Sequence, residues 1–147
     1  MANMATHHMT GKCLCGAVTI NVSGACETEV GACHCRMCQR WSGGLFLSFD
    51  ASPSAVSYDG PVRRFASSSF SERAFCGTCG SPLWMRDTTS PDDMFELMPG
   101  LFDEARHWPL RSEIYVDQAL SCVSLAGDHN RLTAAEYESQ HPHVQGD

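Results

Sequence analysis

The segment Phe75-Cys76-Gly77-Thr78-Cys79-Gly80 contains two cysteines that are separated by two residues, and a glycine follows each cysteine. A two-residue spacer lets both thiolates face one metal ion, and the glycines permit a tight backbone turn. This arrangement is typical of a zinc knuckle. A knuckle supplies only two of the four ligands that a structural zinc ion requires, so a second pair must come from elsewhere in the chain.

Cys13 and Cys15 are the natural second pair. Both cysteine pairs border predicted strands, and a zinc ion bound to all four would join the N-terminal strand to the strand over residues 72–75. Closing such a long loop carries an entropic cost that metal binding can offset. The sequence therefore predicts a closed structural zinc site, the zinc clasp, with four cysteine ligands: Cys13, Cys15, Cys76 and Cys79.

A third cluster, Cys33-His34-Cys35-Arg36-Met37-Cys38, contains three further cysteines. Three thiolates on one zinc ion leave the fourth coordination position to water or substrate, as expected of a catalytic site. His34 could instead close the site as a fourth ligand, although adjacent side chains in an extended segment point to opposite sides. The remaining Cys26 and Cys122 are expected to be buried core residues. A less favoured alternative is that Cys26 lies near the metal ion of the open three-cysteine site.

The bulk composition is that of one soluble globular domain. The chain has 147 residues, 43% of them hydrophobic and 18% charged, and no apolar run long enough to span a bilayer. We expect one domain over residues 11–140, a disordered segment at residues 1–10 and a polar tail at residues 141–147. A formal charge of −7 disfavours nucleic acid as a partner. No membrane partner is expected.

The cysteine content also bears on the compartment. Nine is an odd number for a disulfide framework, and the first ten residues lack the charged start and apolar run of a secretory signal. Closely spaced cysteines in a reducing compartment more often bind metal than form disulfides. We therefore expect the cytoplasm.

Short alternating segments predict a mainly β fold. Val18, Ile20 and Val22 alternate with polar residues, and Asp, Gly, Pro and Ser separate the later strand candidates. The predicted strands cover residues 16–22, 45–49, 55–58, 62–66, 72–75, 83–86, 94–98 and 112–116. Their short spacing indicates antiparallel sheets. Helix is expected only at residues 36–41 and after Thr133, which forms a capping box with Glu136.

Three ordered motifs resemble the glutathione-dependent formaldehyde-activating enzyme family. They are Lys12-Cys13-Leu14-Cys15-Gly16-Ala17-Val18, Cys33-His34-Cys35-Arg36-Met37-Cys38-Gln39-Arg40, and Phe75-Cys76-Gly77-Thr78-Cys79-Gly80-Ser81-Pro82-Leu83. Gly100-Leu101-Phe102-Asp103 and Ile114-Tyr115-Val116 are similar to a later segment of that family. The resemblance thus runs from about residue 11 to residue 116, and the tail from Ser121 on matches nothing.

The resemblance implies a fold of antiparallel sheets often called a β-tent, with two zinc ions. It implies that the clasp cysteines hold structural zinc and that Cys33, Cys35 and Cys38 hold catalytic zinc. The activity implied is the addition of glutathione to formaldehyde, which gives S-hydroxymethylglutathione and is classed with the carbon–sulfur lyases. Glutathione is then a cosubstrate, and the expected partners are a small thiol and a small aldehyde.

The ligand chemistry points the same way. Three thiolates on Zn²⁺ leave a net charge of −1, which weakens the Lewis acidity needed to activate water but suits a soft fourth thiol. Arg40 and Ser42 are the predicted substrate-binding residues, and His34 is a further candidate donor to a developing oxyanion. A non-catalytic zinc scaffold for protein binding remains the alternative, because a fold does not specify a function.

Overall fold

The computed structural model describes residues 4–144, which form two compact units. Unit 1 comprises the chain up to Glu29 together with Ser48–Trp108, and unit 2 comprises Val30–Leu47 together with the chain from Pro109 on. Whether residues 11–140 behave as one domain stays a prediction. In the part of the chain that the structure describes, no helix is long and apolar enough to cross a membrane.

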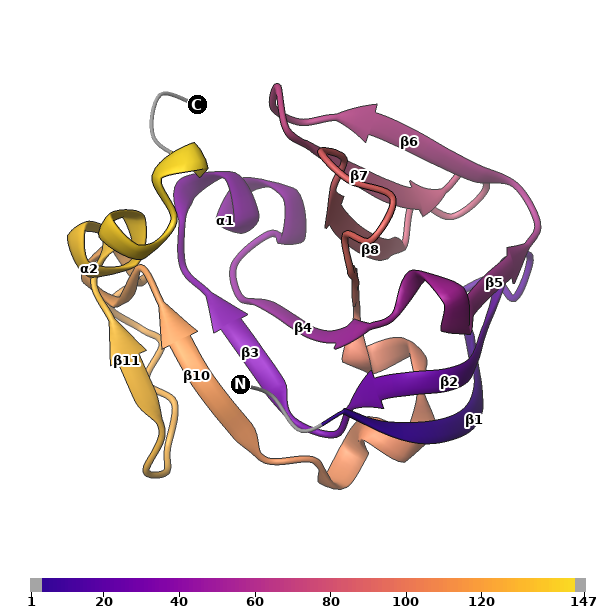
Figure 1. Ribbon diagram of the computed structural model, residues 1–147, viewed down its shortest axis with the longest axis horizontal. Helices are drawn as coiled ribbons and strands as arrows, with labels where there is room; N and C mark the ends of the chain where they lie inside the picture. The colour runs from indigo at the N-terminus through magenta and orange to yellow at the C-terminus, as the bar shows by residue number, and fades with distance from the viewer. Residues whose placement is uncertain (1–3, 145–147) are drawn as a thin grey trace. The chain divides into compact units, whose positions relative to one another are not determined.

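Unit 1 is built from antiparallel strands. One series runs β6-β7-β8-β9-β4, a second runs β1-β2-β5, and β2 meets β4 where Cys26 pairs with Ala51. The strands are β1 (Met4–Lys12), β2 (Thr19–Glu27), β4 (Phe46–Ala51), β5 (Val56–Asp59), β6 (Val62–Ala66), β7 (Ser71–Cys76), β8 (Pro82–Asp87) and β9 (Phe95–Leu97), and Figure 1 labels all of them except β9. The mainly β, antiparallel-rich prediction is confirmed.

The core of unit 1 follows from strand register. Ala74, Trp84, Leu97 and Phe49 are paired in turn across β7, β8, β9 and β4, so their side chains share one face, and all four are buried. Phe49 also packs edge-on against Phe102, with ring centroids 5.4 Å apart. This core carries the strand ends from which the clasp cysteines project.

The expected disordered segment at residues 1–10 is wrong for residues 4–10, which belong to β1, whereas residues 1–3 lie outside the described residues. β1 pairs with β2 along its whole length. The polar composition of β1 gave no strand signal in the sequence, but the strand buries Met9. Gly11 lies against Phe102, and a Cβ added at Gly11 would lie 2.8 Å from the Phe102 ring. Thr10 donates to Asn21 on β2 at 2.7 Å.

Unit 2 contains a parallel sheet, which the prediction of antiparallel pairing missed. β10 (Leu110–Ile114) lies between β3 (Val30–Cys33) and β11 (Asn130–Leu132) and is parallel to both (Figure 1). The helices are α1 (Arg36–Ser42) and α2 (Ala134–Gln140). The predicted capping box of α2 is confirmed, with Thr133 and Glu136 bonded to each other's backbone amides.

Candidate metal centres

The zinc clasp forms at the strand ends of unit 1. Cys13 follows β1 directly and Cys15 lies in the turn that leads to β2, while Cys76 ends β7 and Cys79 lies in the turn before β8. The four Sγ atoms lie within 4.8 Å of one another. Cys13 Sγ is 3.6 Å from Cys15 Sγ, which is 3.8 Å from Cys76 Sγ. The structure thus brings the four predicted clasp cysteines together.

Backbone amides of the turns point at the clasp sulfurs. Val18 N donates to Cys13 Sγ at 3.3 Å, and Thr78 N and Cys79 N donate to Cys76 Sγ at 3.4 and 3.5 Å. Hydrogen bonds from the Ser81 hydroxyl and backbone lower the pKa of Cys79 to about 5. Amide donors favour the charged thiolate over the thiol.

The clasp fits a zinc ion by its donor chemistry. Four thiolates at a zinc–sulfur distance of about 2.3 Å in a tetrahedron stand about 3.8 Å apart. The separations of 3.6 Å between Cys13 Sγ and Cys15 Sγ and of 3.8 Å between Cys15 Sγ and Cys76 Sγ agree with that spacing. All nine cysteines lie in the described residues and all are free thiols. These sulfurs are therefore available as metal ligands.

The second cysteine group lies in unit 2, where β3 passes into α1. Cys33 ends β3, Cys35 is the N-cap of α1 and accepts a hydrogen bond from Cys38 N at 3.4 Å, and Cys38 lies in the first turn. The three Sγ atoms lie within 4.8 Å of one another. In residues 4–144, no fourth His, Cys, Asp or Glu atom joins this group. We call it the three-cysteine site.

The thiols of this group restrain one another's ionisation. Hydrogen bonds with Cys35 and Cys38, and then burial, raise the pKa of Cys33 far above its usual range. Three adjacent thiolates repel each other unless a cation is present, which a metal ion supplies. The donor set of three close sulfurs suits zinc.

The two remaining cysteines differ from each other. Cys26 is fully buried in the core of unit 1, as expected, and belongs to neither sulfur group. The expectation that Cys122 is also a core residue is wrong, because its side chain is exposed. It lies in the irregular segment that precedes β11.

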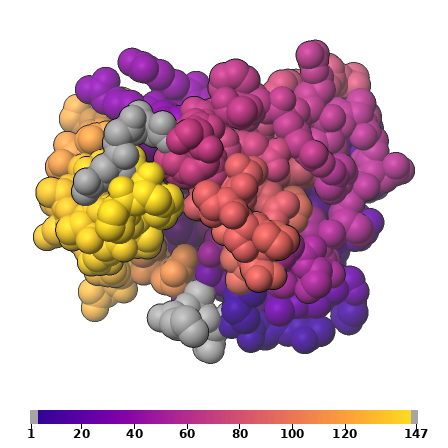
Figure 2. Space-filling view, turned by 45° about the horizontal axis from the view of Figure 1, so that its top comes forward, coloured from indigo at the N-terminus to yellow at the C-terminus, as the bar shows by residue number. Residues whose placement is uncertain are grey.

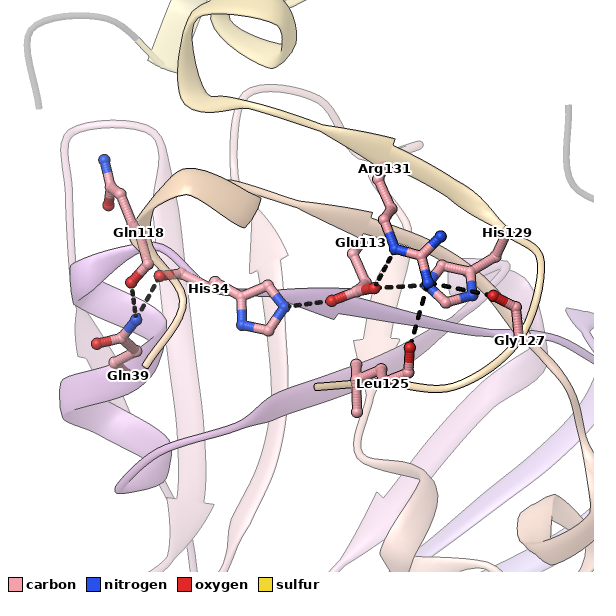
Figure 3. A network of polar contacts seen from close by, with 8 residues as sticks. All are labelled: His34, Gln39, Glu113, Gln118, Leu125, Gly127, His129 and Arg131. Atoms are coloured by element: carbon pink, nitrogen blue, oxygen red, sulfur yellow. Dashed lines mark hydrogen bonds and ion pairs between the residues drawn. The ribbon is translucent and has the colours of Figure 1, made fainter. Parts of the chain in front are cut away.

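His34 does not close the three-cysteine site. Its side chain is 2% exposed, and its Nε2 lies 2.7 Å from Glu113 Oε1 on β10. The other oxygen, Glu113 Oε2, lies 2.5 Å from His129 Nε2 and accepts from Arg131 Nε at 3.1 Å (Figure 3). Burial acts to raise the pKa of Glu113, but hydrogen bonds from His129 and His34 lower it below its usual value. A carboxylate is thus held ionised inside unit 2.

Sequence analysis did not identify Tyr115 as a site residue, just as it did not identify Glu113. It follows Ile114, which pairs with Cys33, and it is the only non-glycine residue with positive φ (58°) among residues 4–144. Such a conformation is uncommon for a bulky residue and often marks a functional position. Its hydroxyl donates to Glu138 Oε1 on α2 at 3.1 Å. Burial, then Glu138, and then Cys35 and Cys33 raise the pKa of Tyr115 above its usual range.

The two predicted substrate-binding residues lie on α1 beside the three-cysteine site. Arg40 is exposed in the last turn of the helix. Ser42 Oγ donates to Cys38 O at 2.8 Å and accepts from Gly44 N at 3.3 Å, so its hydroxyl closes the end of the helix. A role for either residue in binding substrate stays a prediction.

The fold and the two sulfur groups define a mainly β protein with two cysteine clusters suited to metal. The chain belongs to the glutathione-dependent formaldehyde-activating enzyme family, which it matches over residues 8–118. This membership confirms the resemblance of the three cysteine motifs. It also supports an enzyme of lyase type.

Individual relatives agree with this membership. An uncharacterized lyase of Schizosaccharomyces pombe is 29% identical over 127 residues, which cover 86% of this chain and 91% of the relative. A Halomonas elongata protein provisionally named a glutathione-dependent formaldehyde-activating enzyme is 30% identical over 57% of this chain and 59% of its own length. A crystal structure of a Rhodobacter sphaeroides protein covers 69% of this chain and 99% of its own, with 21% identity and a TM-score of 0.53, and supports the fold alone.

Proposed function

We propose that the chain is a zinc-dependent carbon–sulfur lyase that forms or cleaves S-hydroxymethylglutathione, the adduct of glutathione and formaldehyde. The observation that carries the proposal is the three-cysteine site, in which no fourth protein ligand atom joins the sulfurs within the described residues. Family membership supports the formaldehyde-activating type of enzyme, and the name of the yeast relative supports the lyase class.

Cys33, Cys35 and Cys38 would hold the catalytic ion, and the clasp cysteines would hold the structural one. A zinc ion held by three thiolates accepts a soft fourth thiol and favours its deprotonated form at neutral pH. The negative charge of the three cysteine sulfurs makes activation of water less suitable, so hydrolysis is not the proposed reaction.

In the forward reaction the glutathione sulfur attacks the carbonyl carbon of formaldehyde. One carbon–sulfur bond forms, the π electron pair of the carbonyl moves to its oxygen, and the proton lost by the thiol ends on that oxygen. The reverse reaction breaks the same bond and returns the proton to sulfur. The protein must therefore stabilise a developing oxyanion and hold a proton close to it.

We assign this task to Tyr115. Its phenol stays protonated because its pKa is raised, and the residue directly follows Ile114, which pairs in register with Cys33. Its single hydroxyl proton is donated to Glu138 Oε1, so the hydroxyl would have to turn from that carboxylate to the developing oxyanion as the adduct forms. Arg40, exposed on α1, is proposed to pair with a carboxylate of glutathione, and Ser42 would assist only if its helix-end hydrogen bonds were exchanged.

The test is to measure zinc per chain and glutathione affinity in the native protein and in Cys35→Ala. We expect the variant to lose one of two zinc ions and its glutathione binding, while Cys122→Ala, an exposed cysteine outside both groups, changes neither. Native protein that binds two zinc ions but no glutathione would support the scaffold alternative. We expect the protein to act in the reducing cytoplasm, which keeps its thiols free.

Binding alone does not establish catalysis, because thiols add to formaldehyde without an enzyme. The rate of adduct formation must therefore be compared with and without protein. Tyr115→Phe is expected to lower kcat by about 10²-fold with little change in zinc content, the effect of losing one oxyanion donor. Tyr58→Phe, which alters a tyrosine in unit 1, is the control and should retain the native rate.

A further inference from the structure

Glu113 is the centre of a buried polar network that the proposed reaction does not use directly. The residue is 6% exposed, and both of its carboxylate oxygens are bonded: one to His34, the other to His129 and Arg131 (Figure 3). A buried charge is tolerated only when its hydrogen bonds are complete. The three partners therefore constrain one another through this carboxylate.

The network acts on the loop that carries the metal ligands. His34 lies between Cys33 and Cys35, so a bond that holds its ring also limits rotation of the peptide units that carry both sulfurs. Gln39 adds a second constraint, because its Nε2 donates to the carbonyl oxygen of His34 at 2.7 Å and to that of Gln118 at 2.8 Å. The loop is thus held at both the side chain and the backbone of His34.

The other half of the network comes from the chain beyond the family match, which ends at residue 118. Arg131 on β11 pairs in register with Glu113, and its Nη2 donates to the carbonyl oxygens of Leu125 and Gly127 at 3.2 and 3.1 Å. The His129 side chain is 1% exposed. In Figure 2 the described part of the chain that leads toward its C-terminal end forms one continuous yellow surface. This segment therefore supplies two of the three groups that hold the carboxylate.

We propose that Glu113 is a positioning residue for the three-cysteine site, and that residues 119–132 serve to hold it in place. This inference rests on the proposed function only in that the three sulfurs bind a metal ion. A site with three ligands from one short loop lacks the cross-chain restraint of the clasp, whose ligands come from two distant segments. Outer hydrogen bonds must then set the positions of the sulfurs.

The experiment uses cobalt(II) in the full chain, because its visible bands report the arrangement of thiolates around each ion. The spectrum of Cys35→Ala contains the clasp alone, and subtracting it from the native spectrum isolates the three-cysteine site. Glu113→Gln keeps the size of the side chain and removes the charge. Glu72→Gln is the control, because Glu72 forms an ion pair with Arg64 in unit 1.

We expect Glu113→Gln to weaken cobalt and zinc binding at the three-cysteine site by about 10- to 100-fold and to shift its bands, with the clasp unchanged. Glu72→Gln should alter neither site. Native affinity and native bands in Glu113→Gln would overturn the inference. If that variant does not fold, Arg131→Gln, which removes the bond to Glu113 together with the two bonds to the carbonyl oxygens of Leu125 and Gly127, must show the same shift in smaller degree, and its absence is equally decisive.

The two proposals fail in different ways. If the native protein binds two metal ions but no glutathione, the proposed function fails while the metal affinity of Glu113→Gln still tests the positioning role. If the native protein binds glutathione and Glu113→Gln keeps native metal binding, only the positioning role fails.

Discussion

Replacing Cys76 by alanine tests the zinc clasp most directly. Cys15 and Cys76 are 61 positions apart and their sulfurs lie 3.8 Å from each other. Holding the ends of a loop of this length together costs about 4 kcal/mol in chain entropy, which zinc binding would offset. Cys76→Ala should therefore lower the free energy of unfolding by about 4 kcal/mol or more, a large share of the roughly 5–15 kcal/mol typical of a domain.

Urea unfolding in the presence of zinc, followed by tryptophan fluorescence, measures the loss. With a slope of about 2 kcal/mol per molar urea, the transition midpoint should fall by about 2 M. Trp84 is fully buried in the core of unit 1 and should report its unfolding. Zinc content, measured on the same samples, should drop by one ion per chain.

Cys26→Ala is the matched control, because Cys26 is buried in the same core but lies in neither sulfur group. It should cost only about 1 kcal/mol, the packing of one small side chain. Chelation of zinc from the native protein should reproduce the loss seen in Cys76→Ala. A Cys76→Ala protein that keeps its full zinc content and is as stable as Cys26→Ala would refute the clasp.

Two further predictions concern stability in unit 1. Burial, and then nearby carboxylates, raise the pKa of Glu96 to about 8 from 4.5, so the folded state holds a proton that the unfolded state has lost. The free energy of unfolding therefore falls as the pH rises, by about 1.4 kcal/mol between pH 7 and 9 from this residue. In urea titrations of the zinc-saturated protein, Glu96→Gln should remove this dependence of the free energy of unfolding on pH. An unchanged slope would contradict the assignment. Gly60 has φ +111°, and an added Cβ would lie 2.1 Å from Ala17 O, so Gly60→Ala should cost about 2 kcal/mol or more in thermal unfolding. Gly100→Ala, where a Cβ meets nothing within 4 Å, should lie within about 0.5 kcal/mol of the native protein, and equal losses in both variants would disprove the steric argument.

The strands that could be predicted are those whose pattern is local. Residues 62–66 match β6 in full, and residues 72–75 and 83–86 fall within β7 and β8. Polar residues conceal β1, since a strand with one buried face needs few apolar side chains when its partner supplies the core. β11 is only three residues long, too short for a pattern of alternation, and it forms a strand because it pairs with β10.

Ligand type and spacing made both cysteine groups recognisable in the sequence, because a metal ion requires particular atoms within a few residues of one another. That local requirement determined the knuckle at Cys76 and Cys79, the three-cysteine loop and the family to which the chain belongs. Only the tertiary structure decided the partners of Glu113 and the left-handed conformation of Tyr115. His34 and Glu113 are 79 positions apart, and no local pattern encodes a contact that depends on three parallel strands being brought together. Buried charges and strained residues acquire their roles from such long-range packing. The sequence therefore specified the candidate metal ligands, while the structure revealed what surrounds them.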